Sequence, residues 1–230
     1  MTHKTLLNEL NQEIISCRKC PRLVAWREEV ARVKRRAYID QEYWGKPIPG
    51  FGDPKARVLV VGLAPGAHGS NRTGRAFTGD ASGGFLYPAL YRAGFANQPS
   101  AESRHDGLIL KDLYIVAAAR CAPPENKPAP EELSNCQPYL ERELEILKPK
   151  VIVCLGRIAF ERILRIFSIR NSAWKFAHGA LFKLNTDLLN TDQWLLCSYH
   201  PSQQNTLTGK LTVQMFAEIW TKAKELISDE

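Results

Sequence analysis

Four short apolar runs, separated by stretches of helical periodicity, constrain the fold of this chain more than any other feature. The runs are rich in β-branched residues and each has the length of one strand: 57–63, 113–118, 151–155 and 194–198. Apolar residues recur at helical spacing between and after them, over 85–93, 131–147, 158–167 and 211–227. Continuous apolar strands that alternate with helices are typical of a parallel sheet covered on both faces. The sequence therefore predicts an α/β fold.

The 230 residues suit one large domain. We find no internal repeat and no stretch rich enough in Pro, Gly and Ser to separate domains. Hydrophobic residues make up 44% of the chain, which is enough for a sizeable core and excludes disorder over most of its length. We expect a single domain over 1–230, with residues 1–50 as an N-terminal segment packed on it.

The charge of the chain favours a polyanionic partner. Thirty-one basic and twenty-four acidic residues give a net charge of +7, although many basic enzymes bind no nucleic acid. No apolar run approaches the roughly 18 residues of a membrane helix. Glu9 and Glu13 interrupt the apolar residues at the N-terminus, so no signal peptide is indicated. We expect a cytoplasmic monomer that does not contact a membrane.

The six cysteines do not predict disulfides, because no export signal accompanies them. Cys17 and Cys20 form a C-x2-C pair, and Cys121 and Cys136 are separated by fourteen residues. Four thiolates in two groups suit tetrahedral zinc and a cubane iron–sulfur cluster equally well. The other two cysteines lie inside apolar runs and are expected to be inert buried thiols: Cys154 and Cys197.

A glycine-rich loop over 62–80 follows the first apolar run, where functional loops of such folds lie. The loop is not a phosphate-binding loop of nucleotide enzymes, because Arg75 and Ala76 stand where Lys and Ser or Thr would bind phosphate and magnesium. The loop holds one aromatic residue, Phe77, and one acid, Asp80. Each also has a structural explanation, Phe77 as a core residue and Asp80 as the N-cap of the following helix.

Polar residues follow two further runs. Asn126 lies in the segment 120–128 after the second run, and His200 comes directly after the fourth, ahead of a polar loop over 203–210. A lone histidine is usually structural. A histidine directly after one strand, opposite an acid that follows another, favours a functional role.

Taken together, these motifs resemble the iron–sulfur uracil-DNA glycosylases, a branch of the uracil-DNA glycosylase superfamily, and in particular family five, or type B. The resemblance rests on GLAPGAHGSNRTGRAFTGD at 62–80, RCAPPENKP at 120–128 and HPSQQNTLTGKL at 200–211. It implies a three-layer αβα fold with a central four-stranded parallel sheet. It also implies a [4Fe-4S] cluster held, in part by the N-terminal segment, on four cysteines: Cys17, Cys20, Cys121 and Cys136.

The subtype rests on a few positions. Relatives in family four carry Glu where this chain has Leu63 and a base-reading Asn where it has Ala117, whereas family five lacks both and has Asp80. Gly66 looks like family four, because family five commonly has Ala there. The resemblance thus implies a monofunctional DNA repair enzyme that removes uracil, and also hypoxanthine in family five, from DNA and leaves an abasic site. A uracil-specific enzyme like family four is the alternative.

The resemblance also suggests roles for the site residues. Phe77 would stack on a flipped base and Asn126 would read its polar edge. Asp80 would act on the attacking water and stabilise the sugar cation, while His200 would donate to the leaving base. Four positions would contact the base or phosphate through the loop: Gly62, Ala64, Gly66 and His68, the last of which could equally orient the loop. Four side chains are candidates for DNA contact: Arg72, Arg75, Asn205 and Lys210.

Two rival interpretations come from outside this branch of enzymes. A non-catalytic nucleic-acid-binding protein stapled by zinc would be colourless and would tolerate loss of Asp80. A cluster-bearing protein of the same fold could act on a different glycoside or nucleotide.

Overall fold

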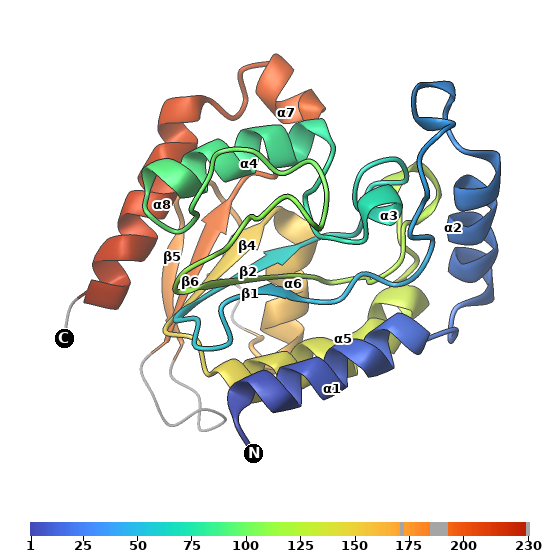
Figure 1. Ribbon diagram of the computed structural model, residues 1–230. Helices are drawn as coiled ribbons and strands as arrows, with labels where there is room; N and C mark the ends of the chain where they lie inside the picture. Colours follow the sequence, from blue (N-terminus) through green and yellow to red (C-terminus); the bar gives the residue numbers. More distant parts are fainter. Residues whose placement is uncertain (171–172, 185–192, 229–230) are drawn as a thin grey trace.

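A six-stranded sheet forms the centre of the computed structural model, which describes residues 1–170, 173–184 and 193–228 (Figure 1). The strand order is β1-β3-β2-β4-β6-β5. The four inner strands are parallel, which confirms the predicted sheet: β3 (Leu113–Ala117), β2 (Val58–Gly62), β4 (Val151–Leu155) and β6 (Gln193–Ser198). Two short antiparallel strands that the sequence did not predict border them: β1 (Phe51–Gly52) and β5 (Leu181–Leu184).

Helices cover both faces of the sheet and make three layers (Figure 1). Along β2, Val58 and Val60 belong to one core cluster and Leu59 and Val61 to the other, as the two-residue period of a strand requires. The first cluster includes apolar side chains of α4 (Ala81–Arg92) and α8 (Val213–Ser228). The second includes those of α1 (His3–Ser16), α5 (Pro130–Leu147) and α6 (Arg157–Ile166).

The N-terminal segment packs against the body of the molecule at two places. Leu10 and Ile14 of α1 are buried with Tyr139 of α5. The next helix, α2 (Pro21–Val33), lies beside α3 (Ser70–Thr73), where the Asn71 amide donates to the Arg27 carbonyl at 3.2 Å (Figure 1). A short 3₁₀ helix follows, η1 (Arg36–Tyr38).

The carboxyl ends of the parallel strands meet at one edge of the sheet, and their loops build the site. The loop after β3 contains a 3₁₀ turn, η2 (Pro124–Asn126). The segment after β6, predicted as a polar loop, instead contains a short helix, α7 (Gln203–Leu207), whose N-cap Ser202 accepts from the Asn205 N–H. Within the described ranges, no helix has the length and apolarity that a bilayer crossing needs.

Candidate active site

A cleft of about 800 Å³ opens at the carboxyl edge of the sheet. Its walls come from the loops after β2, β3 and β6 and from the segment around η1. The eight residues that the sequence suggested for catalysis and base binding all line it: Gly62, Ala64, Gly66, His68, Phe77, Asp80, Asn126 and His200. Segments far apart along the chain therefore converge on one cavity.

The Phe77 ring lies between the end of β2 and His200. Its backbone is left-handed, with φ of +50°, which is uncommon for a bulky residue. A Cβ on Gly62 would lie 3.0 Å from the Phe77 ring, so glycine there allows the ring to approach the strand end. The Phe77 and His200 ring centroids are 5.8 Å apart, with planes tilted by 33°. The cleft thus contains an aromatic surface next to an imidazole.

The Asp80 carboxylate presents its two oxygens to different surroundings. One oxygen, Oδ1, accepts from the Gly83 N–H at 2.9 Å and caps α4. The other, Oδ2, lies beside two cleft-lining glycines, where a Cβ would be 1.9 Å away on Gly69 and 3.2 Å away on Gly66. Burial raises the pKa of Asp80, while backbone hydrogen bonds and Arg72 act against the rise. The capping role and a role in the cleft therefore do not exclude each other.

His200 follows β6 and is held through its backbone. The Asn205 side chain, predicted to contact DNA, donates to the His200 carbonyl at 2.8 Å and so fixes the turn that carries the histidine. Burial lowers the pKa of His200 to about 4. The imidazole is therefore neutral near pH 7 and retains one N–H for hydrogen bonding.

His68 is oriented by a residue that the sequence analysis missed. The Tyr43 hydroxyl lies 3.1 Å from His68 Nδ1 and accepts from the Arg35 backbone N–H at 3.4 Å. With that N–H supplying one hydrogen bond, the Tyr43 proton can be donated to Nδ1, which leaves the His68 N–H at Nε2. Burial lowers the pKa of His68, as do Arg35 and Arg72. Tyr43 lies in a charged segment without a motif, so no sequence signal singled it out.

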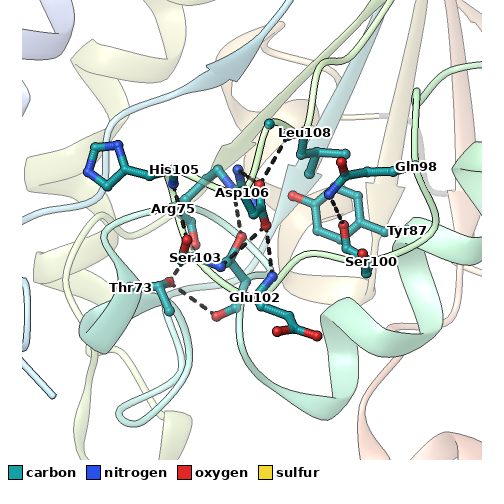
Figure 2. Close-up of polar contacts among 12 residues, drawn as sticks. Thr73, Arg75, Tyr87, Gln98, Ser100, Glu102, Ser103, His105, Asp106 and Leu108 are labelled. Carbon is teal, nitrogen blue, oxygen red and sulfur yellow. Dashed lines mark hydrogen bonds and ion pairs between the residues drawn. The ribbon is translucent and has the colours of Figure 1, made fainter. Parts of the chain in front are cut away.

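Two of the predicted DNA contacts are corrected by the structure. Arg72 donates to the carbonyls of His68 and Gly79, both at 2.7 Å. Arg75 is only 4% exposed and forms a two-pronged ion pair with Asp106, at 2.8 and 2.7 Å (Figure 2). Both guanidinium groups hold the glycine-rich loop in place and do not face solvent as phosphate contacts. Lys210, in contrast, is exposed, with its ammonium 5.0 Å from the Tyr199 ring centroid.

The four cysteines singled out as ligands line a second, smaller cavity between α2, α5 and the loop after β3. Its other walls include Arg120 and Tyr139. None of the six cysteines is in a disulfide, and the other two are buried in neighbouring strands, as predicted: Cys154 and Cys197. The part of the chain that the structure describes contains no group of three or more His, Cys, Asp or Glu side chains arranged around one metal ion.

N–H groups reach three of these sulfur atoms, although burial raises the pKa of the Cys121 and Cys136 thiols. Arg27 Nη1 donates to the Cys121 sulfur at 2.8 Å, and N–H groups of Asn135 and Arg120 donate to two further cysteines at 3.5 and 3.4 Å. Arg27 is only 2% exposed, and a buried cation requires a compensating negative charge. The exposed Glu28 carboxylate, 3.8 Å away, supplies part of that charge, and metal-bound thiolates would add to it inside the cavity. Arg27 was missed, although it lies one helical turn after Leu23 and Val24 on the buried face of α2.

Comparisons with known proteins agree with this geometry. The model of the Uracil DNA glycosylase superfamily matches residues 49–224. A type-5 uracil-DNA glycosylase of Thermus thermophilus is 54% identical over 94% of this chain and 95% of its own length, and one of Mycobacterium tuberculosis is 48% identical over 96% and 82%. A type-4 uracil-DNA glycosylase of Archaeoglobus fulgidus is 30% identical over 85% and 81%. The chain therefore belongs to the uracil-DNA glycosylase superfamily and, within it, to the type-5 family.

Proposed function

We propose that this protein is a DNA repair enzyme that hydrolyses the N-glycosidic bond of uracil in DNA and leaves an abasic site. The observation that carries the proposal is the single cleft in which eight candidate residues from the ends of three parallel strands converge. The described lining of the cleft contains no lysine that could form a Schiff base with the sugar. The enzyme is therefore monofunctional and leaves the phosphodiester backbone intact.

The cleft binds a base that has been flipped out of the stack. Phe77 stacks on the π face of the base, and Asn126, at the exposed mouth of the cleft, offers both donors and an acceptor to its polar edge. Gly62, Ala64 and Gly66 also line the cleft, and because the Gly62 and Gly66 carbonyls already accept from the N–H groups of Ala118 and Asn71, the loop offers its backbone N–H groups to the base. His68, oriented by Tyr43, donates from Nε2 to the base or to the phosphate of the flipped nucleotide.

The chemistry divides between Asp80 and His200. As the C1′–N bond breaks, positive charge develops on the sugar and negative charge on the base. The Asp80 carboxylate stabilises the sugar cation and takes a proton from the water whose oxygen bonds to C1′. His200, neutral at pH 7, donates a hydrogen bond to a base oxygen without transferring its proton. The base leaves as an anion and is protonated by solvent.

Cys17, Cys20, Cys121 and Cys136, which line the small cavity, would hold a [4Fe-4S] cluster. The cluster would link the N-terminal segment to the loop after β3 and to α5 and would take no part in bond cleavage. Arg27 compensates part of its negative charge. Zinc is the rival occupant, and only the iron–sulfur cluster gives an absorbance shoulder near ~400 nm.

One chain supplies every candidate residue of the cleft and the cysteine cavity, which supports action on DNA as a monomer. We place this action in the cytoplasm. The exposed Arg35, which lines the cleft, and the exposed Lys210, which follows α7, provide phosphate contacts. Its bases are uracil and, as a second substrate, hypoxanthine.

Single-turnover incubation with end-labelled oligonucleotides, followed by alkali, tests the proposal. Strands carry uracil, hypoxanthine or normal bases at one position. We expect alkali-dependent cleavage at uracil and at hypoxanthine and none at normal bases. Cleavage without alkali would indicate lyase activity, and cleavage at uracil alone would favour the narrower base range of family four. An intact uracil strand after alkali would refute the proposal.

A further inference from the structure

A second groove lies beside the candidate active site. It has a volume of about 810 Å³ and is formed by residues from 41–46 and 102–106 together with Tyr38, Arg72 and Gly79. Tyr38 and Gly79 also line the catalytic cleft, so the two cavities are contiguous. The proposed reaction assigns this groove no role. We call it the flanking groove.

Aromatic rings and cations are interleaved along the flanking groove. The Arg104 guanidinium lies 4.3 Å from the centroid of the Trp44 indole, and the Lys46 ammonium lies 5.3 Å from it. At the junction with the cleft, the Arg72 guanidinium lies 4.0 Å from the Tyr38 ring centroid, and because its N–H groups are bonded within the protein, it supports that ring and is not itself a nucleotide contact. Aromatic rings and guanidinium planes both stack on unpaired bases, and the cations attract phosphates. This surface chemistry is typical of a site for single-stranded nucleic acid.

One acid that lines the groove, Asp106, is neutralised within the protein. Figure 2 shows Asp106 enclosed by Arg75 and by the backbone N–H groups of Glu102, Ser103 and Leu108. Although burial opposes the effect, these hydrogen bonds hold the pKa of Asp106 below its ordinary value. The negative charge of Asp106 is therefore neutralised by Arg75 and does not repel a phosphate in the groove.

The charges that remain at the groove are mixed. Arg104 and Lys46 are exposed, and so are two acids that also line the groove, Glu42 and Glu102. With cations and acids balanced, net charge alone cannot account for binding. Most of the affinity therefore comes from stacking on the Arg104 guanidinium, which the Trp44 indole supports from beneath.

We propose that the flanking groove binds unpaired nucleotides of the uracil-containing strand, directly beside the flipped nucleotide. This inference rests on the proposed function, because the contiguous cleft is what fixes which strand enters. A duplex keeps its bases paired, so only its phosphates reach the groove, whereas an unpaired strand offers phosphates and base faces together. The protein therefore gains affinity for uracil in single-stranded or locally melted DNA from contacts that duplex DNA does not make.

Fluorescence anisotropy with a labelled oligonucleotide tests the groove. The probe carries one non-cleavable 2′-fluoro-2′-deoxyuridine and is used as a single strand and as a duplex. We expect Arg104→Ala and Trp44→Leu each to weaken single-strand binding by about tenfold and duplex binding by less than about threefold. Trp44→Phe keeps an aromatic face and should retain most of the affinity. Probes that end at the uridine on its 5′ or its 3′ side locate the nucleotides that occupy the groove. The probe that lacks those nucleotides should bind wild type, Arg104→Ala and Trp44→Leu with similar Kd values.

Arg92→Ala is the matched control, because Arg92 is also exposed but lies at the end of α4 opposite Asp80. It should change neither Kd. Melting temperatures of all variants verify the fold. Equal losses for single strand and duplex, or no loss for Arg104→Ala and Trp44→Leu, would overturn the groove assignment. The ratios of Kd values do not depend on excision. A wild-type protein that excises no uracil would therefore refute the proposed function, and the anisotropy measurements would still test the groove assignment.

Discussion

The two carboxylate oxygens of Asp80 have different roles. Oδ1 caps α4, whereas Oδ2 lies against the glycines of the cleft. In Asp80→Asn, a side-chain oxygen still accepts from Gly83, and asparagine caps helices as well as aspartate does. We therefore expect a nearly unchanged melting temperature. The variant has no carboxylate for the water or the sugar cation, so single-turnover excision of uracil should fall by about 10²–10⁴-fold.

Asp80→Ala is the comparison that isolates the cap. It removes both oxygens, so it should lose about 1 kcal/mol of stability in addition to activity. Thermal melts and single-turnover rates on the same preparations measure the two effects. Asp80→Asn protein that excises uracil near the wild-type rate would assign the attacking water to another group.

His200 makes stability depend on pH in a defined window. Its pKa is lowered by burial from 6.5 to about 4 in the folded protein, so the unfolded chain binds the proton more tightly. The contribution of the neutral imidazole to stability is fully present above pH 6.5 and is lost as the pH falls toward 4. Urea titrations of wild type and His200→Asn should diverge in their pH dependence over this range. Parallel curves would contradict a buried neutral His200, and His105→Asn, at an exposed histidine, is the control.

At the scale of elements, the Arg75–Asp106 ion pair joins the loop after β2 to the loop before β3 (Figure 2). Arg75→Ala leaves the Asp106 carboxylate without its cation, and breaking a buried pair in this way costs about 3–5 kcal/mol. Phe77 lies two residues further on, so excision should decline together with stability. Urea unfolding of Arg75→Ala, Asp106→Asn and the double variant measures the coupling. If Arg75 were a phosphate contact instead, its removal would weaken DNA binding at unchanged stability.

The fold was predictable where strand residues are apolar throughout and was missed where they are not. All five residues of β2 and of β4 are buried, and short β-branched runs of this kind favour strands covered on both faces. The edge strand β1 has two residues, both half-buried, and β5 has only one buried residue. An edge strand forms because it pairs with a neighbouring strand, and the local sequence does not reveal that pairing. The five-residue helix α7 is likewise too short for a periodic signal.

The site was predictable to the extent that strand ends define it. Asp80, Asn126 and His200 follow strands whose carboxyl ends share one edge, so their convergence follows from the topology. The ion pair of Arg75 could not be predicted, because its partner Asp106 is 31 residues away and lies outside any motif. Tyr43 was missed for the same reason, since its partner is His68, 25 residues further along the chain.

At the scale of the whole molecule, the cleft of the candidate active site and the cysteine cavity are built from separate parts of the chain. The catalytic cleft is built mainly on loops of the parallel sheet, whereas the cysteine cavity lies where α2 meets α5 and the loop after β3. Residues 34–46, which lead from α2 toward the sheet, contribute Arg35 and Tyr38 to the cleft and Tyr43 to His68. Anchoring α2 therefore also positions one wall of the cleft.

Loss of one cysteine ligand should then reduce stability and activity together. Cys17→Ser and Cys136→Ser each remove one link between the N-terminal segment and the body, and such sites usually contribute to folding itself. We expect lower soluble yield, a lower melting temperature and loss of the absorbance shoulder near ~400 nm. Cys154→Ala is the matched control, because Cys154 is buried in β4 outside the cavity, and it should leave the shoulder intact. Full activity, stability and colour in Cys17→Ser and Cys136→Ser would refute the assignment of these cysteines as ligands. A colourless wild type that holds one zinc ion per chain would support the four ligands but show that they bind zinc and not an iron–sulfur cluster.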